Sequence, residues 1–164
     1  LAKVDYSLLP IAFRDKKDYA EFELPKSISL KTTIHDVIDF SKKVDDTFYY
    51  SDKKNKFYNE LKKHMNSHDT IYQWRRVYVR ENKSNLVPTL TANMGTGGHN
   101  VPLILTYNNE IRKLTPRECF NVQGFPSSYL LPEQSNGRLY KQAGNSVAVP
   151  VVERITKKIA QAIL

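Results

Sequence analysis

The sequence predicts an α+β fold, in which a small, mostly β part with surface helices precedes one long C-terminal helix. Three observations lead to this prediction. Strand-like segments gather between residues 73 and 107, and a well-capped short helix follows at residue 115. The last segment repeats apolar residues every four positions, which is typical of an amphipathic helix. Because such an apolar stripe must be covered, we expect the last helix to pack against another surface.

The composition is that of a folded intracellular protein. The chain has 164 residues, enough for one domain or for one small domain plus an appendage. Its apolar runs are too short to cross a bilayer, so we expect no membrane partner. The single cysteine, Cys119, excludes an internal disulfide and fits a reducing compartment. We therefore expect a cytoplasmic, nucleoid-associated protein.

The charge of the chain favours an acidic partner. The formal net charge is +8 and the isoelectric point is about 9.5, which most often indicates nucleic acid. Residues 53–83 contain nine Lys or Arg and three acids, and Tyr58, Tyr72, Trp74 and Tyr78 are interleaved with them. A solvated helix face explains the lysines of this segment equally well. For the arginines and aromatic residues of 73–80, nucleic-acid contact is the better interpretation.

In the first half of the chain we expect one strand and two helices. Residues 8–13 form a short apolar run that predicts a strand, and residues 14–18 a charged turn. Thr33 can cap a helix that carries Ile34, Val37 and Ile38 on one face. Residues 51–68 are polar and lysine-rich, and predict a surface helix with a narrow apolar stripe of Phe57, Leu61 and Met65.

Three further strands are expected in the middle of the chain. Residues 73–80 alternate well enough for a strand, with Val77 and Val79 on one side. Residues 86–91 predict a second strand, which leads into a glycine-rich loop. Residues 101–107 predict a third strand, turned by Asn108 and Asn109.

Two helices complete the predicted fold. Thr115 can be the N-cap of the first, with Pro116 at the first helical position and Glu118 closing a capping box. Gly124 and Pro126 should end this helix. By pattern alone, residues 144–146 are a helix start whose amides could face an anion or a carbonyl. The apolar stripe of the C-terminal helix consists of Val147, Val151, Ile155, Ile159 and Ile163.

Three blocks of this sequence resemble one protein family. Residues 112–126 (RKLTPRECFNVQGFP) closely resemble the ninth conserved motif of cytosine-5 DNA methyltransferases, and residues 140–152 (YKQAGNSVAVPVV) resemble the tenth. Residues 87–103 (VPTLTANMGTGGHNVPL) look like the threonine-leucine core and glycine loop of the family's target-recognition domain. Three blocks in the family's order argue against a chance match.

The resemblance implies a division of the chain into three parts. Residues 15–134 would be the target-recognition domain including the ninth motif, and residues 135–164 the tenth motif and the C-terminal helix. Residues 1–14 could contain the last strand of a catalytic domain. The C-terminal helix would then pack on an α/β catalytic domain that is absent from this chain.

The resemblance also implies a reaction. These enzymes flip a cytosine out of duplex DNA and transfer a methyl group from S-adenosylmethionine to its carbon five. Their nucleophile lies in a Pro-Cys motif, their glutamate in a Glu-Asn-Val motif, and their cofactor loop is a Phe-x-Gly-x-Gly turn. None of the three occurs in this sequence, so we expect no catalytic residue here. Cys119 lies inside the ninth motif, and we expect it to be a small core residue.

Site residues follow from the same resemblance. With one gap in the match, Gln73 would fill the space left by the flipped base and Arg76 would read guanine, although the arginines could also contact only phosphate. Thr89 would hold the phosphate beside the flipped nucleotide. The expected DNA contacts are Gln73, Arg75, Arg76, Tyr78, Arg80, Thr89, Thr91, Asn93, Gly95, Gly97 and Gly98.

A cofactor contact is expected and a metal site is not. Asn145 and Ser146 match positions that line the pocket of S-adenosylmethionine, whose main body would lie in the catalytic half. The chain's histidines show no ligand spacing with Cys119 or with paired acids.

The sequence therefore predicts the DNA-recognition part of a cytosine-5 DNA methyltransferase of a restriction–modification system. We expect it to be inactive alone, either as a fragment or as the smaller subunit of a split enzyme, with double-stranded DNA and the catalytic half as partners. The alternative is a non-enzymatic, sequence-specific DNA-binding module, and an RNA-directed relative is a distant third. Asn145 and Ser146 argue against the alternative, because a pure binding protein has no use for a cofactor-side motif.

Overall fold

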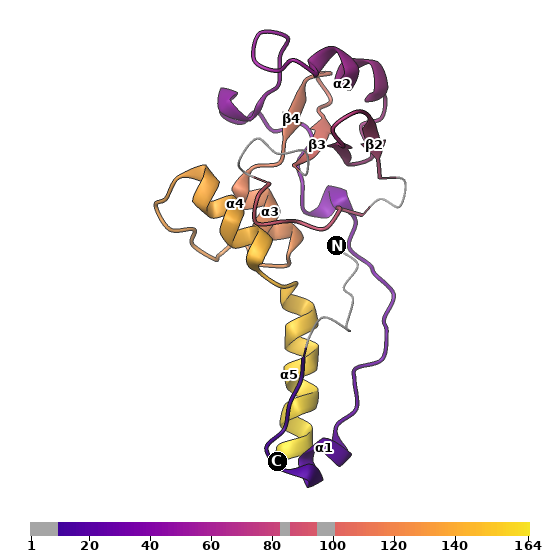
Figure 1. Cartoon of the computed structure of the whole chain (residues 1–164), viewed down its shortest axis with the longest axis vertical. Helices are drawn as coiled ribbons and strands as arrows, with labels where there is room; N and C mark the ends of the chain where they lie inside the picture. Colours follow the sequence, from indigo (N-terminus) through magenta and orange to yellow (C-terminus); the bar gives the residue numbers. More distant parts are fainter. Residues whose placement is uncertain (1–9, 83–85, 95–100) are drawn as a thin grey trace.

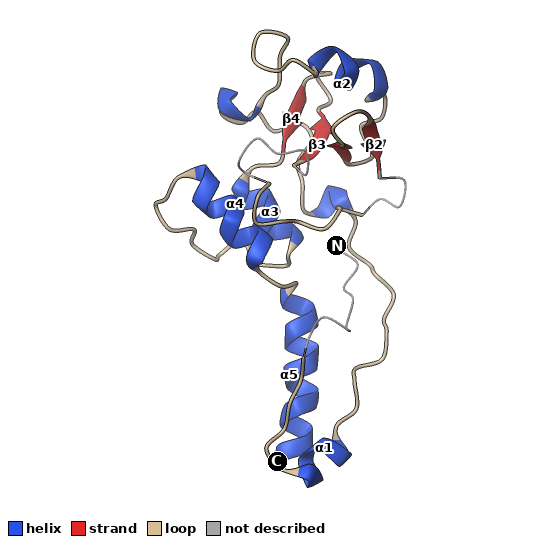
Figure 2. Ribbon diagram, viewed as in Figure 1, coloured by secondary structure: helices blue, strands red, loops and turns tan. Residues whose placement is uncertain are grey.

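The computed structural model describes residues 10–82, 86–94 and 101–164. Its four strands form one antiparallel sheet in the order β2-β1-β3-β4. Figure 2 shows this sheet at one end of the molecule and a long helix at the other. The α+β class is therefore confirmed. The strands are β1 (Tyr72–Trp74), β2 (Val79–Glu81), β3 (Pro102–Leu105) and β4 (Ile111–Lys113).

The longest helix extends away from the rest of the molecule (Figure 1). At its far end this helix, α5, contacts α1. Arg154 of α5 donates a hydrogen bond to the carbonyl oxygen of Lys26 at 2.6 Å. The helices are α1 (Lys16–Glu21), α2 (Tyr58–His64), α3 (Pro116–Val122), α4 (Asn136–Asn145) and α5 (Val149–Ile163), with 3₁₀ turns at Ile34–Asp36 and Asp46–Phe48.

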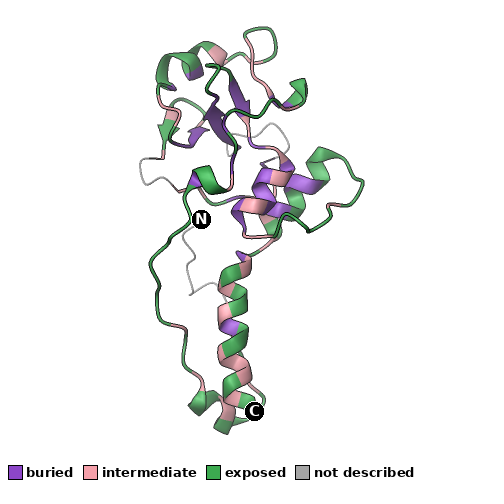
Figure 3. Ribbon diagram, turned by 180° about the vertical axis from the view of Figure 1, so that it is seen from behind, coloured by how far each residue is buried: buried purple, intermediate pink, exposed green. Residues whose placement is uncertain are grey.

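The hydrophobic core surrounds the sheet and α3. All four residues of β3 are buried, and Leu61 of α2, Phe120 of α3 and Tyr140 of α4 pack into the same cluster. Figure 3 shows that α5, by contrast, is mainly exposed or half-buried, and Ile155 is its one buried residue. The apolar stripe of α5 is thus only partly covered within the described residues.

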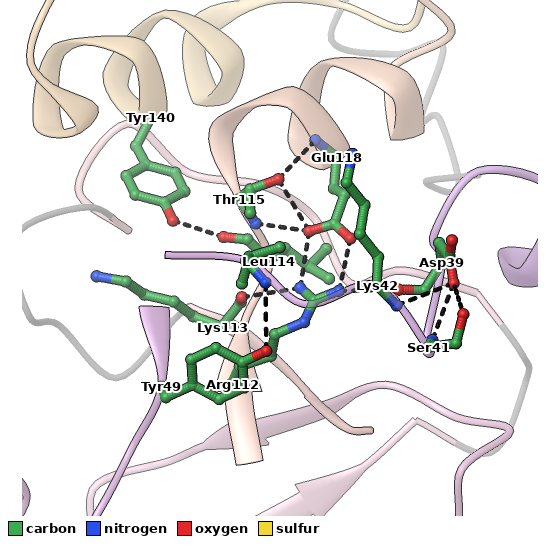
Figure 4. Close-up of polar contacts among 11 residues, drawn as sticks. Asp39, Ser41, Lys42, Tyr49, Arg112, Lys113, Leu114, Thr115, Glu118 and Tyr140 are labelled. Atoms are coloured by element: carbon green, nitrogen blue, oxygen red, sulfur yellow. Dashed lines mark hydrogen bonds and ion pairs between the residues drawn. The ribbon is translucent and has the colours of Figure 1, made fainter. Parts of the chain in front are cut away.

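A buried ion pair joins the sheet to α3 (Figure 4). The guanidinium of Arg112 in β4 donates to both carboxylate oxygens of Glu118 at 2.7 and 2.8 Å, and to the carbonyl oxygen of Asp39 at 3.0 Å. The Arg112 side chain is completely buried. Glu118 also accepts from the Thr115 amide at 2.7 Å, while Thr115 Oγ1 accepts from the Glu118 amide at 3.2 Å. The predicted capping box is confirmed, and its glutamate doubles as the partner of a buried arginine.

Several predictions for the first half of the chain are wrong or only partly right. Residues 10–13 are not a strand, whereas residues 8 and 9 lie outside the described residues. The predicted charged turn is largely helix α1, since Lys, Ala and Glu are good helix formers. The predicted cap at Thr33 is confirmed, but a single 3₁₀ turn follows it. The helix expected over residues 51–68 shrinks to α2, with Leu61 and Met65 of its stripe buried and Phe57 packed against the core.

Two of the three central strands also differ from the prediction. Residues 73–80 form not one strand but two that fold back on each other, because Arg76 adopts a φ of 68° and reverses the chain. Residues 86–91 are not a strand either, although Val87 and Leu90 are buried as core residues. The third strand, β3, and its turn at residues 108–109 are confirmed.

The predicted helix start at residues 144–146 is wrong. Gly144 and Asn145 are the last residues of α4, and Ser146 is its C-cap. The Ser146 amide donates to the carbonyl oxygen of Ala143, so it does not face outward to an anion. The sequence signal for α4 is weak because two of its ten residues are glycines and its mean hydropathy is low. The C-terminal helix itself is confirmed, with Pro150 in its first turn.

Candidate nucleic-acid interface

The β1–β2 hairpin presents a strained arginine at its tip. Trp74 pairs with Val79, and the Arg75 amide donates to the carbonyl oxygen of Tyr78 at 2.8 Å, which leaves Arg76 and Val77 at the turn. Arg76 is exposed, and its φ of 68° is a left-handed conformation that a long side chain rarely adopts. Because such strain gathers at functional sites, the hairpin tip is a candidate contact surface.

Aromatic packing attaches this hairpin to α2. The Trp74 indole stacks on the Phe57 ring with centroids 4.9 Å apart and planes within 5°. Lys62 and Lys63 of α2 are exposed, and α2 also contacts β2. Two elements that pack on each other therefore both carry exposed cations, the side chains that neutralise phosphates in a nucleic-acid complex.

Most of the predicted DNA-contacting residues within the described parts of the chain are accessible. Gln73 is the exception: it is buried in β1 with 4% of its surface exposed. In this conformation Gln73 has almost no surface to offer a base, and a contact would require the hairpin to move. Arg76, Tyr78, Arg80, Thr89 and Asn93 are exposed, Arg75 and Thr91 are half-buried, and Gly95, Gly97 and Gly98 lie outside the described residues.

Two buried side chains fix the segment that presents the threonines. Leu90 and Met94 lie in the core, with 4% and 0% of their surfaces exposed. Thr91 between them donates from Oγ1 to Oδ1 of Asn93 at 2.7 Å, and its carbonyl oxygen accepts from the Met94 amide. This turn therefore holds the polar side chains of Thr91 and Asn93 together at the surface.

The predicted cofactor-side residues lie at the end of α4. Asn145 is exposed, whereas the half-buried Ser146 hydroxyl donates to the carbonyl oxygen of Ala143 at 2.7 Å. A shallow hollow of about 430 Å³ opens there, and two of its lining residues, Arg138 and Lys141, are cationic. The hollow is lined by Gln134, Arg138, Lys141, Gln142, Asn145 and Ser146.

Gln123 holds the turn at the end of α4, at residues 143–146. Sequence reasoning did not find this role. The Gln123 side chain is buried, and Nε2 lies within donor distance of the carbonyl oxygens of Ala143 at 3.2 Å and Ser146 at 3.4 Å. Its own carbonyl oxygen accepts from the Val149 amide at 2.8 Å. These partners are at least twenty residues away, so local sequence carries no signal for the contact.

Cys119 is a core residue, as predicted. Its side chain is fully buried in α3. Burial, and then the neighbouring Glu118 carboxylate, raise the pKa of the thiol well above its ordinary value. Because the thiolate is the nucleophilic form, this environment disfavours attack by Cys119.

Residues 10–82, 86–94 and 101–164 contain neither a metal-binding cluster nor a membrane-spanning helix. No group of three or more His, Cys, Asp or Glu in these ranges could hold a metal ion. No helix there is both long and apolar enough to cross a membrane.

Comparison with known proteins identifies the family. The model of the C-5 cytosine-specific DNA methylase family matches residues 8–161. The type II methyltransferase M.Bsp6I of Bacillus sp. (strain RFL6) is 57% identical over 154 residues, which are 94% of this chain and 49% of that protein. M1.ScrFI of Lactococcus lactis subsp. cremoris is 30% identical over 88% of this chain and 35% of its own length. M.HpaII of Haemophilus parainfluenzae is 55% identical over 51 residues, 31% of this chain and 14% of its own.

This chain thus spans half or less of the length of the curated relatives that it matches. The match nevertheless covers almost all of the chain's own residues. The chain therefore belongs to the C-5 cytosine-specific DNA methylase family.

Proposed function

We propose that this chain is the DNA-recognition part of a cytosine-5 DNA methyltransferase of a restriction–modification system. The observation that carries the proposal is the strained hairpin, which exposes Arg76 and packs on the lysine-containing helix α2 in a member of this family. Arginine can pair bidentately with guanine in the major groove, and the lysines can neutralise phosphates without regard to sequence. The chain would thus read the site while a catalytic half performs the transfer.

The DNA surface that we propose consists of two segments. The hairpin tip would enter a groove with Arg76, flanked by Tyr78 and Arg80. The turn at residues 89–93 would contact the backbone through Thr89 and base edges through Thr91 and Asn93. The burial of Gln73 makes it the weakest of the expected contacts, and we propose it only for a DNA-bound state in which the hairpin has moved.

S-adenosylmethionine would lie against the end of α4, in a site completed by the catalytic half. The hollow there fits part of the cofactor, because Arg138 and Lys141 are cations suited to its carboxylate and Asn145 and Ser146 offer amide and hydroxyl groups. When bound, the cofactor supplies the methyl group. This chain's own residues would orient it.

The exposed side of α5 would pack on that catalytic half. Val152 and Ile163 keep 43% and 54% of their surfaces exposed, and Val147 just before the helix keeps 40%. Apolar surface of this extent on one helix is expected to be covered in the assembled enzyme.

Complementation tests the proposal and separates it from a non-enzymatic binding module. The chain is mixed with the part of M.Bsp6I that it does not match, and methyl transfer to DNA is measured for each part alone and for the mixture. We expect activity only in the mixture. Site-specific DNA binding without methylation in any pairing would favour the binding module, and methylation by the chain alone would contradict the proposed division of labour.

A further inference from the structure

Gly144 lies where α4 meets the backbone of the threonine segment. A Cβ atom at this position would come within 3.0 Å of the carbonyl carbon and oxygen of Thr91 and of the Ala92 amide nitrogen. These are backbone atoms, which cannot swing aside as the end of a side chain can. Gly137 in the same helix has nothing within 4 Å of the corresponding position. Glycine is unfavourable inside a helix, so a close approach explains its presence at residue 144 and not at 137.

This contact connects the two surfaces proposed above. Asn145, on the cofactor side, directly follows Gly144 in the chain. Thr91, on the DNA side, holds Asn93 through a 2.7 Å hydrogen bond. The end of α4 and the DNA-side turn therefore touch backbone to backbone, with no side chain between them to absorb a displacement.

The end of α4 is also held by α3. Gln123 approaches the carbonyl oxygens of Ala143 and Ser146 from α3. Gly124, with a φ of 84°, lies directly against the Pro150 ring, where a Cβ would be only 2.5 Å from Cδ. Because α3 holds the end of α4 through these contacts, α4 is not free to move independently of α3. An added methyl group at residue 144 must displace the threonine turn, the cofactor-side turn or both.

We propose that Gly144 is a positioning residue that sets the place of the DNA-side turn relative to the cofactor-side turn. The inference rests on the proposed function, because it assumes that Thr91 and Asn93 face DNA. A shift on the order of 1 Å in such a segment is enough to reduce specific recognition strongly. Gly144 thus acts on DNA selectivity although it lies in the block that resembles a cofactor motif.

The test compares Gly144→Ala with Gly137→Ala, which adds the same methyl group to the same helix in open space. The cognate site is first selected from a random-sequence duplex library with the wild-type chain. The affinities for this duplex and for an unrelated duplex are then measured for each variant. We expect Gly144→Ala to reduce the ratio of the two affinities at least tenfold and Gly137→Ala to keep it. Loss of folded protein alone lowers both affinities equally and leaves the ratio unchanged.

The outcomes distinguish this inference from the proposed function. A wild-type chain that prefers no duplex contradicts the proposed function itself. A wild-type preference that survives Gly144→Ala unchanged overturns the positioning role alone. Should Gly144→Ala fail to fold, Gln123→Ala removes the contact of α3 with the same turn without adding an atom. We then expect Gln123→Ala to lower the affinity ratio at least tenfold, and an unchanged ratio would overturn the inference.

Discussion

Replacing Arg76 with glycine should test its role in DNA recognition without a large change in stability. The reason is the backbone conformation of Arg76, which glycine adopts without strain. At a φ of 68°, a residue with a Cβ is strained by about 1–2 kcal/mol, and glycine is not. Glycine offsets this gain by about 0.5–1 kcal/mol through the entropy of the unfolded chain. The two contributions partly cancel. We therefore expect Arg76→Gly to leave the free energy of unfolding within about 1 kcal/mol of the wild type, while it removes the guanidinium.

The loss in DNA binding should be larger and specific. A bidentate contact to guanine contributes about 1–3 kcal/mol, or roughly 5- to 150-fold in the dissociation constant for the cognate duplex. Unrelated DNA should be affected little. Arg76→Lys keeps the charge but cannot form the planar paired contact, so it should lose most of the discrimination as well.

The assay is DNA binding at several salt concentrations, with the catalytic half present, together with denaturant unfolding of each variant. Asn109→Gly is the matched control, since Asn109 also has a positive φ, of 61°, at an exposed turn for which no DNA contact is proposed. Should Arg76→Gly weaken binding to cognate and unrelated DNA equally, or should Arg76→Lys restore full discrimination, Arg76 contacts phosphate and the base-reading assignment is wrong.

Four further substitutions test other parts of the structure. Glu118→Gln should lower the free energy of unfolding by about 3–5 kcal/mol in a denaturant titration, because it leaves the charge of the buried Arg112 unpaired. A smaller loss in the Arg112→Met, Glu118→Leu double variant would show that the unpaired charge is the cause. Cys119→Ser should retain covalent trapping of the assembled enzyme on a suicide-substrate duplex, and loss of trapping would make the thiol a nucleophile after all. Asn145→Ala should raise the Michaelis constant for S-adenosylmethionine and leave DNA affinity unchanged; the reverse pattern in steady-state kinetics would move Asn145 to the DNA side. Lys62→Ala should weaken cognate and unrelated DNA alike and reduce the slope of log affinity against log salt by about 0.9, whereas an unchanged slope would mean that Lys62 contacts no phosphate.

Features set by neighbouring residues could be predicted from the sequence. The capping box of Thr115 and Glu118 involves residues three apart, and a turn at residues 108–109 needs only the local tolerance of asparagine for a positive φ. The apolar spacing of α5 is likewise a local property. Each of these elements is where the sequence places it.

Features set by contacts between residues distant in the sequence could not be predicted from it. The chain reverses at Arg76, a residue type that does not favour a positive φ, because Trp74 is fixed on Phe57 and β2 pairs with β1. Helix α4 is stabilised by packing on α3, whose residues are about twenty positions earlier. Arg112 would be assigned to the surface by residue type alone, yet it is buried, where Glu118 compensates its charge and the carbonyl oxygen of Asp39, 73 positions earlier, accepts from its guanidinium. In each case a partner remote in sequence overrides the local preference.

The same distinction explains why the candidate sites are only partly visible in the sequence. Motif blocks identify the side chains that could meet DNA or cofactor, since these residue types are matched to a chemistry. They do not show how those side chains are held. Gln123 and Gly144 make no proposed contact with either ligand, yet both contribute to the packing of the turn that carries Asn145 and Ser146. Gly144 also touches the backbone of Thr91. A change in the packing of α3 would therefore displace the DNA-side turn as well as the cofactor-side turn. The two proposed surfaces are therefore best understood as faces of one support built from α3, α4 and the turn at residues 89–94.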